Sequence, residues 1–457
     1  MSESASPSPA ARRYPQAQDS KTPLIIILLL ILVIMVPIEL GFNIGPLFFT
    51  WSRFFLVIMA FVILPKLWTL ELRLHDWFFI GHVAWTCIAF AHVYGLGNSI
   101  ERSGTYVLEF LIVYLTARIY LQHLEQMRAV FGTLFIMVIV SAIAAFPEAM
   151  TGIRYVHDFA TSLTGTTYKY NSEIRMGITR ATSFFEHPIL YGVFCSSLFS
   201  LMWFTSSVSQ RIFKTPIIAL ATWLSASSAP ILILLLQAFL VLVERVTRTV
   251  QNRLLIVTGI AFTLVTIAQA ATGRGFAGIL AMVTLNPGTT YVRRMQWNFA
   301  IQDVLRHPLL GFEPSTWTRP FWLAPSIDNY WLLMMMRSGI PSLILLALCV
   351  FFIWRNMVRR QNMPQLYDQI RIGWGLMMVA LIIGAATVAF FGKLQPLMAF
   401  YLGLGSALVS CRVPEAKDAS APAEAPPGGI RYSRFAHNRK PPAPAARPNP
   451  YARSGDK

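Results

Sequence analysis

Residues 24–40 read LIIILLLILVIMVPIEL, an apolar run in which the first charged side chain is Glu39. About 20 mostly apolar residues cross a bilayer as a helix, so this run predicts a membrane span. Eleven more runs of this kind follow it along the chain. The twelve predicted spans lie near 24–40, 46–64, 77–95, 104–120, 128–146, 188–206, 212–228, 229–243, 253–271, 338–354, 371–391 and 394–411. The predicted fold is therefore an all-α polytopic membrane protein with about twelve transmembrane helices.

The composition of the whole chain agrees with this interpretation. Of 457 residues, 55% are hydrophobic and 13% are charged, about half the charged share of a typical soluble domain. The mean hydropathy is +0.53. These values exclude an ordinary soluble enzyme and a disordered chain. The four cysteines lie in or beside apolar runs and show neither a disulfide framework nor metal-ligand spacing.

The net charge of +17 is explained by membrane topology rather than by nucleic acid, because most Lys and Arg residues lie between apolar runs. They gather on one side of the predicted membrane, together with the N-terminal segment 1–23 and the Pro-rich, disordered, basic tail 412–457. The positive-inside rule makes that side cytoplasmic, with both termini. The transmembrane domain, 24–411, then places two long loops, about 147–187 and 272–337, in the periplasm of a bacterial inner membrane.

The first long loop ends in a group of candidate site residues at the mouth of a helix. Arg175 and Arg180 are its basic residues closest to the membrane, where an arginine can clamp a phosphate with two parallel hydrogen bonds. An arginine there can equally bond lipid headgroups. Glu186 and His187 precede Pro188, so they are either catalytic candidates or caps of the next helix.

The second long loop contains an amphipathic stretch over 293–306, which predicts a helix on the membrane surface with Arg293 and Arg294 in its first turn. The loop is cationic overall. This charge suits an anionic lipid-linked substrate, and it suits plain headgroup binding as well. Asp328 stands at the entry of the next span, where an ionisable group is often functional, although it or Asn329 can also cap the helix.

Two further charges, Arg53 and Glu109, fall inside predicted spans. Intramembrane charges usually pair with one another or with polar groups, so we expect a structural pairing for each. Nucleotide-binding and zinc-binding motifs of the GxxxxGK[ST], GxGxxG and HExxH types are absent from the sequence, so no cofactor and no metal is predicted.

Taken together, these residues resemble those of the bacterial O-antigen ligase/polymerase family, the Wzy- and WaaL-type integral membrane glycosyltransferases. The resemblance covers roughly 175–345 by motif and the whole chain by layout. Its features are, in order, Arg180 with Phe184-Phe185-Glu186-His187-Pro188, a short hinge at 225–230, Arg293-Arg294 through Trp297 to Pro308-Leu309-Leu310-Gly311, and Asp328-Asn329-Tyr330-Trp331-Leu332 with Gly339-Ile340.

The resemblance implies transfer of a glycan from undecaprenyl pyrophosphate to an acceptor hydroxyl at the periplasmic face. It implies that Arg180 and Arg293 or Arg294 bind the pyrophosphate. The hinge 225–230 lacks the arginine that family members often carry there. Asp328 stands where many ligases carry histidine, which makes it the candidate catalytic base, with His187 or Glu186 in reserve.

A polymerase of lipid-linked repeat units for O-antigen or exopolysaccharide is therefore the predicted function. Two alternatives remain open at this point. One is an O-antigen ligase that uses the lipid A core or another acceptor, and the other is a transporter or flippase without covalent chemistry. The predicted partners are the lipid-linked glycan and membrane lipids, with no nucleic acid. A chain-length regulator or a flippase is left open as a protein partner.

Overall fold

The structure, a computed structural model, describes residues 21–44, 47–166, 173–247, 287–360 and 363–411, together with the single positions 259 and 263. The chain divides into two compact units, Met1–Val413 and Pro414–Lys457, and all described residues belong to the first. The predicted span at 253–271, almost all of the N-terminal segment and the predicted tail lie outside the described residues.

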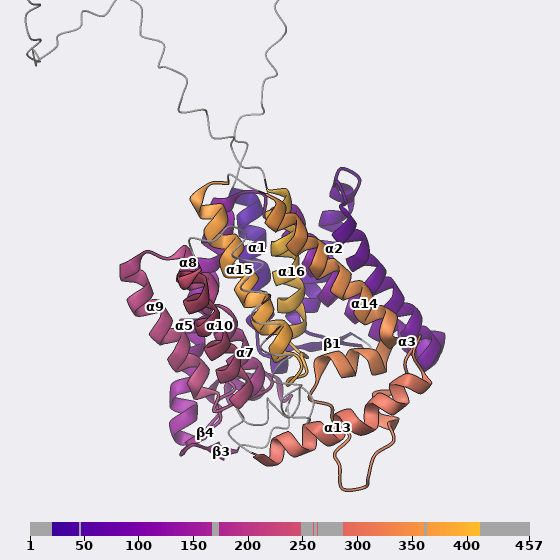
Figure 1. The fold of residues 1–457 in the computed structure, drawn as a ribbon. Helices are drawn as coiled ribbons and strands as arrows, with labels where there is room; N and C mark the ends of the chain where they lie inside the picture. Colours follow the sequence, from indigo (N-terminus) through magenta and orange to yellow (C-terminus); the bar gives the residue numbers. More distant parts are fainter. Residues whose placement is uncertain are drawn as a thin grey trace, which may run out of the picture. The chain divides into compact units, whose positions relative to one another are not determined.

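The described unit is mainly helical, as predicted (Figure 1). Its helices are α1 (Lys21–Met35), α2 (Trp51–Leu67), α3 (Leu74–Tyr106), η2 (Val107–Ile112), α4 (Val113–Tyr120), α5 (Leu124–Thr151), α6 (Tyr155–Thr164), α7 (Pro188–Ser197), α8 (Phe199–Thr205), α9 (Val208–Leu224), α10 (Ser228–Val246), α13 (Pro287–Arg306), α14 (Tyr330–Arg359), α15 (Gln365–Gly384) and α16 (Leu394–Ser410), with the short 3-10 turns η1 (Ile38–Leu40) and η3 (Pro314–Thr316). Each of the eleven predicted spans within the described residues coincides largely with helix.

Two small antiparallel hairpins interrupt the all-α prediction. One pairs β1 (Phe42–Ile44) with β2 (Leu47–Phe49), and the other pairs β3 (Ile174–Arg175) with β4 (Ile178–Thr179). Both lie in connections between helices, where the backbone hydrogen-bonding groups need partners. Strand β2 falls inside the predicted span 46–64, so the helix there begins later than predicted, at Trp51. The second hairpin lies in the first long loop, for which no strand was predicted.

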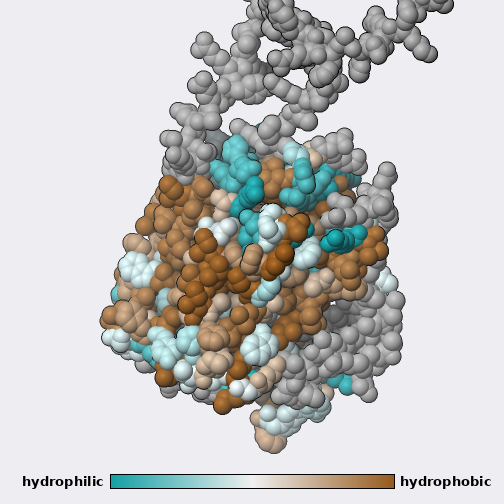
Figure 2. Space-filling model, turned by 90° about the vertical axis from the view of Figure 1, so that its left-hand side faces the viewer, coloured by the Kyte–Doolittle hydropathy of each residue, from teal (hydrophilic) through white to brown (hydrophobic). Residues whose placement is uncertain are grey.

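Six described helices are long and apolar enough to cross a membrane, and Leu24–Met35 and Leu394–Ser410 are shorter apolar helices. Their outward surfaces are apolar as well: Ile143 of α5 is 68% exposed and Leu242 of α10 is 59% exposed. Figure 2 shows a broad hydrophobic belt, with hydrophilic residues gathered at one end. Exposed apolar area of this extent is covered by lipid in a membrane protein, so the unit is membrane-embedded.

The longest of these apolar helical segments, Leu74–Tyr120, is two antiparallel passes. The Tyr114 hydroxyl donates to Asp76 Oδ1 at 2.6 Å, and the Tyr114 and Phe79 rings stack with centroids 4.0 Å apart. In a straight helix Tyr114 and Asp76 would be about 57 Å apart. The reversal uses Gly95, whose φ is +76°. The spans predicted at 77–95 and 104–120 therefore form a hairpin.

Basic residues from the predicted cytoplasmic connections meet at one end of the bundle. Arg73 and Arg360 donate to the main-chain carbonyls of Val409 and Cys411, at the carboxyl end of α16. Cations are favoured at that end of a helix dipole. Gln395, at the opposite end of α16, lines the large cavity described below. The cavity and this basic cluster therefore lie at opposite ends of the helix.

Candidate functional site

Gly311, in the turn that follows α13, and Gly339, within α14, let these two segments pack backbone against backbone. We call this contact the glycine lock. Gly311 and Gly339 have φ values of +69° and +74°, where a side chain is strained. A Cβ atom at Gly339 would overlap the Leu309 carbonyl, and one at Gly311 would overlap the Met336 carbonyl. The close backbones are joined by hydrogen bonds from Phe312 N to Met336 O (2.6 Å) and from Ile340 N to Pro308 O (2.8 Å). The third and fourth features of the family resemblance therefore pack directly on each other.

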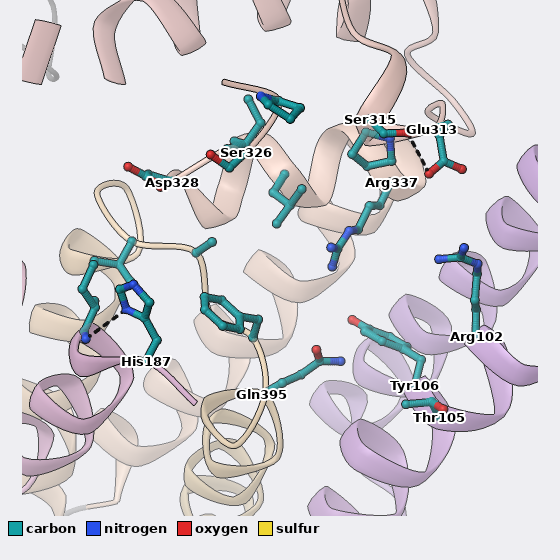
Figure 3. Close-up of a pocket in the computed structure, with 18 of the residues that line it drawn as sticks. Arg102, Thr105, Tyr106, His187, Glu313, Ser315, Ser326, Asp328, Arg337 and Gln395 are labelled. Atoms are coloured by element: carbon teal, nitrogen blue, oxygen red, sulfur yellow. Dashed lines mark hydrogen bonds between the residues drawn. The ribbon is translucent and has the colours of Figure 1, made fainter. Parts of the chain in front are cut away.

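At one end of the bundle lies a cavity of about 1530 Å³ (Figure 3). Among the described residues that line it, cationic side chains outnumber anionic ones. Its charged lining residues are the arginines Arg53, Arg102, Arg175, Arg180, Arg293 and Arg337 and the carboxylates Glu101, Glu313 and Asp328. The lining also includes His187, Tyr94 and Tyr106. The size suits a substrate larger than a drug-sized molecule.

The cavity has two ends of different character. Figure 3 shows His187 and Asp328 on its left and Arg102, Tyr106, Glu313 and Arg337 on its right. We call the first the His187 end, formed by Arg175, Arg180, His187, Arg293 and Asp328. We call the second the Tyr106 end, formed by Tyr94, Glu101, Arg102, Tyr106, Glu313 and Arg337. Six of the seven predicted site residues, all except Arg294, lie at or next to the His187 end.

At the His187 end, Arg175 and Arg180 are held by one carboxylate. Arg175 Nη2 and Arg180 Nη1 lie 2.8 and 2.9 Å from Glu173 Oε2. Arg180 is buried, and its Nη2 donates to Ser227 Oγ at 2.9 Å. Burial alone would raise the pKa of Glu173, but the hydrogen bond from Arg180 and both positive charges lower it. The hinge at 225–230 thus orients Arg180 through a hydroxyl group.

Arg293 and Arg294 are adjacent on α13 but lie in different surroundings. Arg293 lines the cavity, with Nε 3.5 Å from Asp328 Oδ2, whereas Arg294 is exposed and does not line it. Arg293 Nη1 is buried and has no hydrogen-bond partner among the described residues. Burial and the charge of Arg175 lower the pKa of Arg293, and Asp328 opposes this only in part. The geometry therefore favours Arg293 over Arg294 as an anion ligand.

Asp328 lies in the cavity with its side chain 39% exposed. The cap of α14 is instead Asn329, whose Oδ1 accepts from Leu332 N at 3.0 Å. The capping role left open for Asp328 is therefore filled by its neighbour. Gln296 of α13 accepts from the Asp328 backbone N–H at 3.2 Å and fixes the loop to the amphipathic helix.

His187 is the N-cap of α7, and its Nδ1 accepts from Ile189 N at 3.2 Å. An accepting Nδ1 carries no proton, so the neutral ring is protonated at Nε2. Burial, with help from the charges of Arg180 and Arg175, lowers the pKa of His187 to about 4. At pH 7 the side chain is therefore a neutral hydrogen-bond donor, which suits binding an anion better than removing a proton.

Glu186, the neighbouring candidate, is buried away from the cavity lining. Its Oε1 lies 3.2 Å from Lys393 Nζ, and a Cβ atom at Gly392 would contact its Oε2. Lys393 also donates to the Phe184 carbonyl. This pair holds the α7 entry against the start of α16, so Glu186 has a structural contact in the described part of the chain.

The two roles of His187 can be separated by substitution. Asparagine is also a good N-cap, so His187→Asn should leave thermal stability close to that of the wild type, whereas His187→Ala should lose about 1 kcal/mol. If His187 also donates to substrate, both variants lose turnover to a similar degree. Thermal melts and turnover of the purified protein in nanodiscs measure the two effects. Full turnover in His187→Asn would restrict His187 to capping.

Several cavity residues were not assigned a role in the sequence prediction. Arg102, Tyr106, Glu313 and Arg337 belong to none of the sequence motifs that carry the family resemblance. No local signal places them together, because the glycine lock and the reversal at Gly95 bring their helices to one cavity. The structural pairing expected for each of Arg53 and Glu109 is with the other, with Nε and Oε1 2.8 Å apart.

No protein-family model matches the chain, and no curated protein matches it. The family resemblance therefore remains a prediction from the quoted residues. Within the described ranges, no group of three or more His, Cys, Asp or Glu side chains is placed to hold a metal ion.

Proposed function

We propose that the protein polymerises oligosaccharide repeat units carried on undecaprenyl pyrophosphate, with the cavity at the periplasmic face of the bacterial inner membrane. The observation that supports this most is the arginine-rich cavity at one end of an apolar helical bundle. A lipid-linked diphosphate presents a strong anion at the membrane surface with its lipid still in the bilayer. A cationic cavity at the end of membrane helices is suited to that substrate.

The donor pyrophosphate would bind at the His187 end. Arg180 is already oriented by Glu173 and Ser227, so little ordering is needed on binding. Arg293 brings a buried donor, Nη1, that has no other partner in the described residues. A pyrophosphate that engages Arg293 competes with Asp328 for the same guanidinium. Substrate binding would thereby loosen the Asp328 carboxylate for a second task.

That second task is removal of a proton. The acceptor hydroxyl oxygen attacks the anomeric carbon of the donor, and the bond from that carbon to the pyrophosphate oxygen breaks. The lipid pyrophosphate leaves with the bonding electrons, and the hydroxyl proton passes to the Asp328 carboxylate. Arginines at the leaving oxygen would stabilise the charge that develops there. The ligase alternative uses the same step with a different acceptor.

A transporter is the second candidate, and one specific observation favours it. Both α3 and α14 are broken at glycines, Gly95 and Gly339, and both contribute to the cavity wall. Broken helices at a central site are common in secondary transporters. Here, however, the glycine lock at Gly339 opposes movement of α14.

Deletion of the gene in the source organism separates these functions. Mass analysis of lipid-linked and surface glycans should show single repeats on the carrier lipid and no polymer. Long polymer retained on the carrier lipid would indicate a ligase instead. Unchanged glycans would remove both enzymatic proposals and leave transport.

A further inference from the structure

The Tyr106 end differs from the His187 end in what it offers for hydrogen bonding. Its charged lining residues are balanced in number, with two arginines, Arg102 and Arg337, and two carboxylates, Glu101 and Glu313. None of these four forms an ion pair within 4 Å in the described part of the chain. Glu313 Oε1 accepts from Ser315 Oγ at 3.2 Å (Figure 3), and its carboxylate has further acceptor sites. A pyrophosphate only accepts hydrogen bonds, whereas a sugar hydroxyl both donates and accepts. A balanced set of donors and acceptors fits hydroxyl groups better than a diphosphate.

Tyr106 adds a hydrogen-bond acceptor, and the orientation of its hydroxyl group is set by His82. His82 is fully buried, and its Nδ1 lies 2.8 Å from the Ser342 carbonyl oxygen, which can only accept. Ser342 Oγ lies 3.0 Å from the same nitrogen and can accept as well, so a proton on Nδ1 satisfies both contacts. Because a buried imidazole without a carboxylate partner stays neutral, Nε2 must accept. It accepts from the Tyr106 hydroxyl at 2.7 Å. The hydroxyl proton of Tyr106 is therefore donated to His82, and the hydroxyl oxygen can accept hydrogen bonds from a ligand in the cavity.

Aromatic faces complete this end. The Arg102 guanidinium lies over the Tyr94 ring, 4.1 Å from its centroid, and Tyr106 stacks on Phe110 with centroids 5.0 Å apart. These ring contacts hold the Arg102 and Tyr106 side chains in place without an ion pair to a carboxylate. Figure 3 shows Arg102 and Tyr106 projecting from one helix toward Arg337.

We propose that the Tyr106 end is the binding site for the sugar hydroxyls of the acceptor glycan, with the diphosphate at the His187 end. This assignment rests on the proposed function, and it fixes which substrate occupies which end of the cavity. Tyr106 and Glu313 accept from acceptor hydroxyls, and Arg337 and Arg102 donate to them. Asp328, at the other end, then meets the single hydroxyl that reacts.

The test measures binding of two ligands to the full-length protein in nanodiscs, and each variant should weaken the binding of only one of them. Two probes are titrated: inorganic pyrophosphate, and a repeat-unit oligosaccharide released by mild acid from the source organism's surface polysaccharide. Glu313→Gln should weaken oligosaccharide binding about tenfold and Tyr106→Phe about three- to tenfold, with pyrophosphate affinity unchanged. Arg293→Ala should weaken pyrophosphate binding and leave the oligosaccharide affinity unchanged. Arg294→Ala, outside the cavity, is the matched control.

Each outcome decides something. Oligosaccharide affinity that is unchanged in both Glu313→Gln and Tyr106→Phe, or reduced equally by Arg293→Ala, overturns the assignment of the Tyr106 end while pyrophosphate binding keeps the proposed function. If the wild type binds neither pyrophosphate nor the oligosaccharide, both proposals are overturned. Tyr106→Phe leaves His82 without its partner, so Glu313→Gln, on a half-buried loop residue, supplies the result if the tyrosine variant fails to fold.

Discussion

Arg293→Ala is expected to reduce polymer formation about a hundredfold or more, while the protein remains in the membrane at normal abundance. Arg293 brings a buried, unbonded guanidinium nitrogen to the cavity and pairs with Asp328, the proposed base. Its loss would remove a donor from the leaving pyrophosphate and leave Asp328 without its partner. Losing one such preorganised donor costs about 10²- to 10³-fold in turnover. Repeat units added per minute to a lipid-linked donor, in proteoliposomes, are the measurement.

Arg294→Ala is the matched control for this experiment. The two residues are adjacent on α13, carry the same charge and differ in that only Arg293 lines the cavity. A general effect of basic charge on lipid binding would reduce the activity of both variants equally. A selective loss in Arg293→Ala would support a direct role in the site. Equal loss in both, or full activity in Arg293→Ala, would contradict the assignment of the His187 end.

The sequence predicted the apolar helices but not α6, which lies in the predicted first long loop. Apolar runs predict membrane helices because the requirement of the bilayer is local and averaged over many residues. The residues that the structure brings together at the His187 end could also be chosen from the sequence, since His187 and Arg180 stand beside a helix entry and Arg293 begins an amphipathic stretch. The distinction between Arg293 and Arg294 was not predictable, because it depends on the rotation of α13 about its own axis.

The Tyr106 end could not be predicted for a different reason. His82 and Tyr106 lie in two successive predicted spans, 77–95 and 104–120, and both are typical of span residues. Their contact exists only because the chain reverses between them, and Ser342 reaches His82 from a helix much later in the chain. Likewise, the hinge seemed to lack its basic residue, yet Ser227 reaches Arg180 and takes part in the site. Long-range contacts of this kind leave no periodic signal in the sequence.

Three glycine-to-alanine substitutions should give a graded series of thermal stabilities. Gly104 is helical, exposed and free of close neighbours, so Gly104→Ala should stabilise the protein by up to about 1 kcal/mol. Gly95 has a φ of +76° and open space around it, so Gly95→Ala carries backbone strain alone, about 1–2 kcal/mol. Gly339 combines a φ of +74° with overlap of the Leu309 carbonyl. Gly339→Ala should therefore cost about 3 kcal/mol or more, as strain and overpacking add.

The order of melting temperatures in nanodiscs, Gly104→Ala above wild type, then Gly95→Ala, then Gly339→Ala, is the measurement. A Gly339→Ala protein as stable as Gly95→Ala would mean that α14 can separate from the Pro308–Gly311 turn at little cost. The cavity wall that carries Arg337 would then be movable, and the transporter would gain weight over the polymerase. A selective loss at Gly339 would mean that both ends of the cavity are held at a fixed separation. Glycan transfer needs that rigidity, because the acceptor hydroxyl must stay aligned with the anomeric carbon while the pyrophosphate leaves.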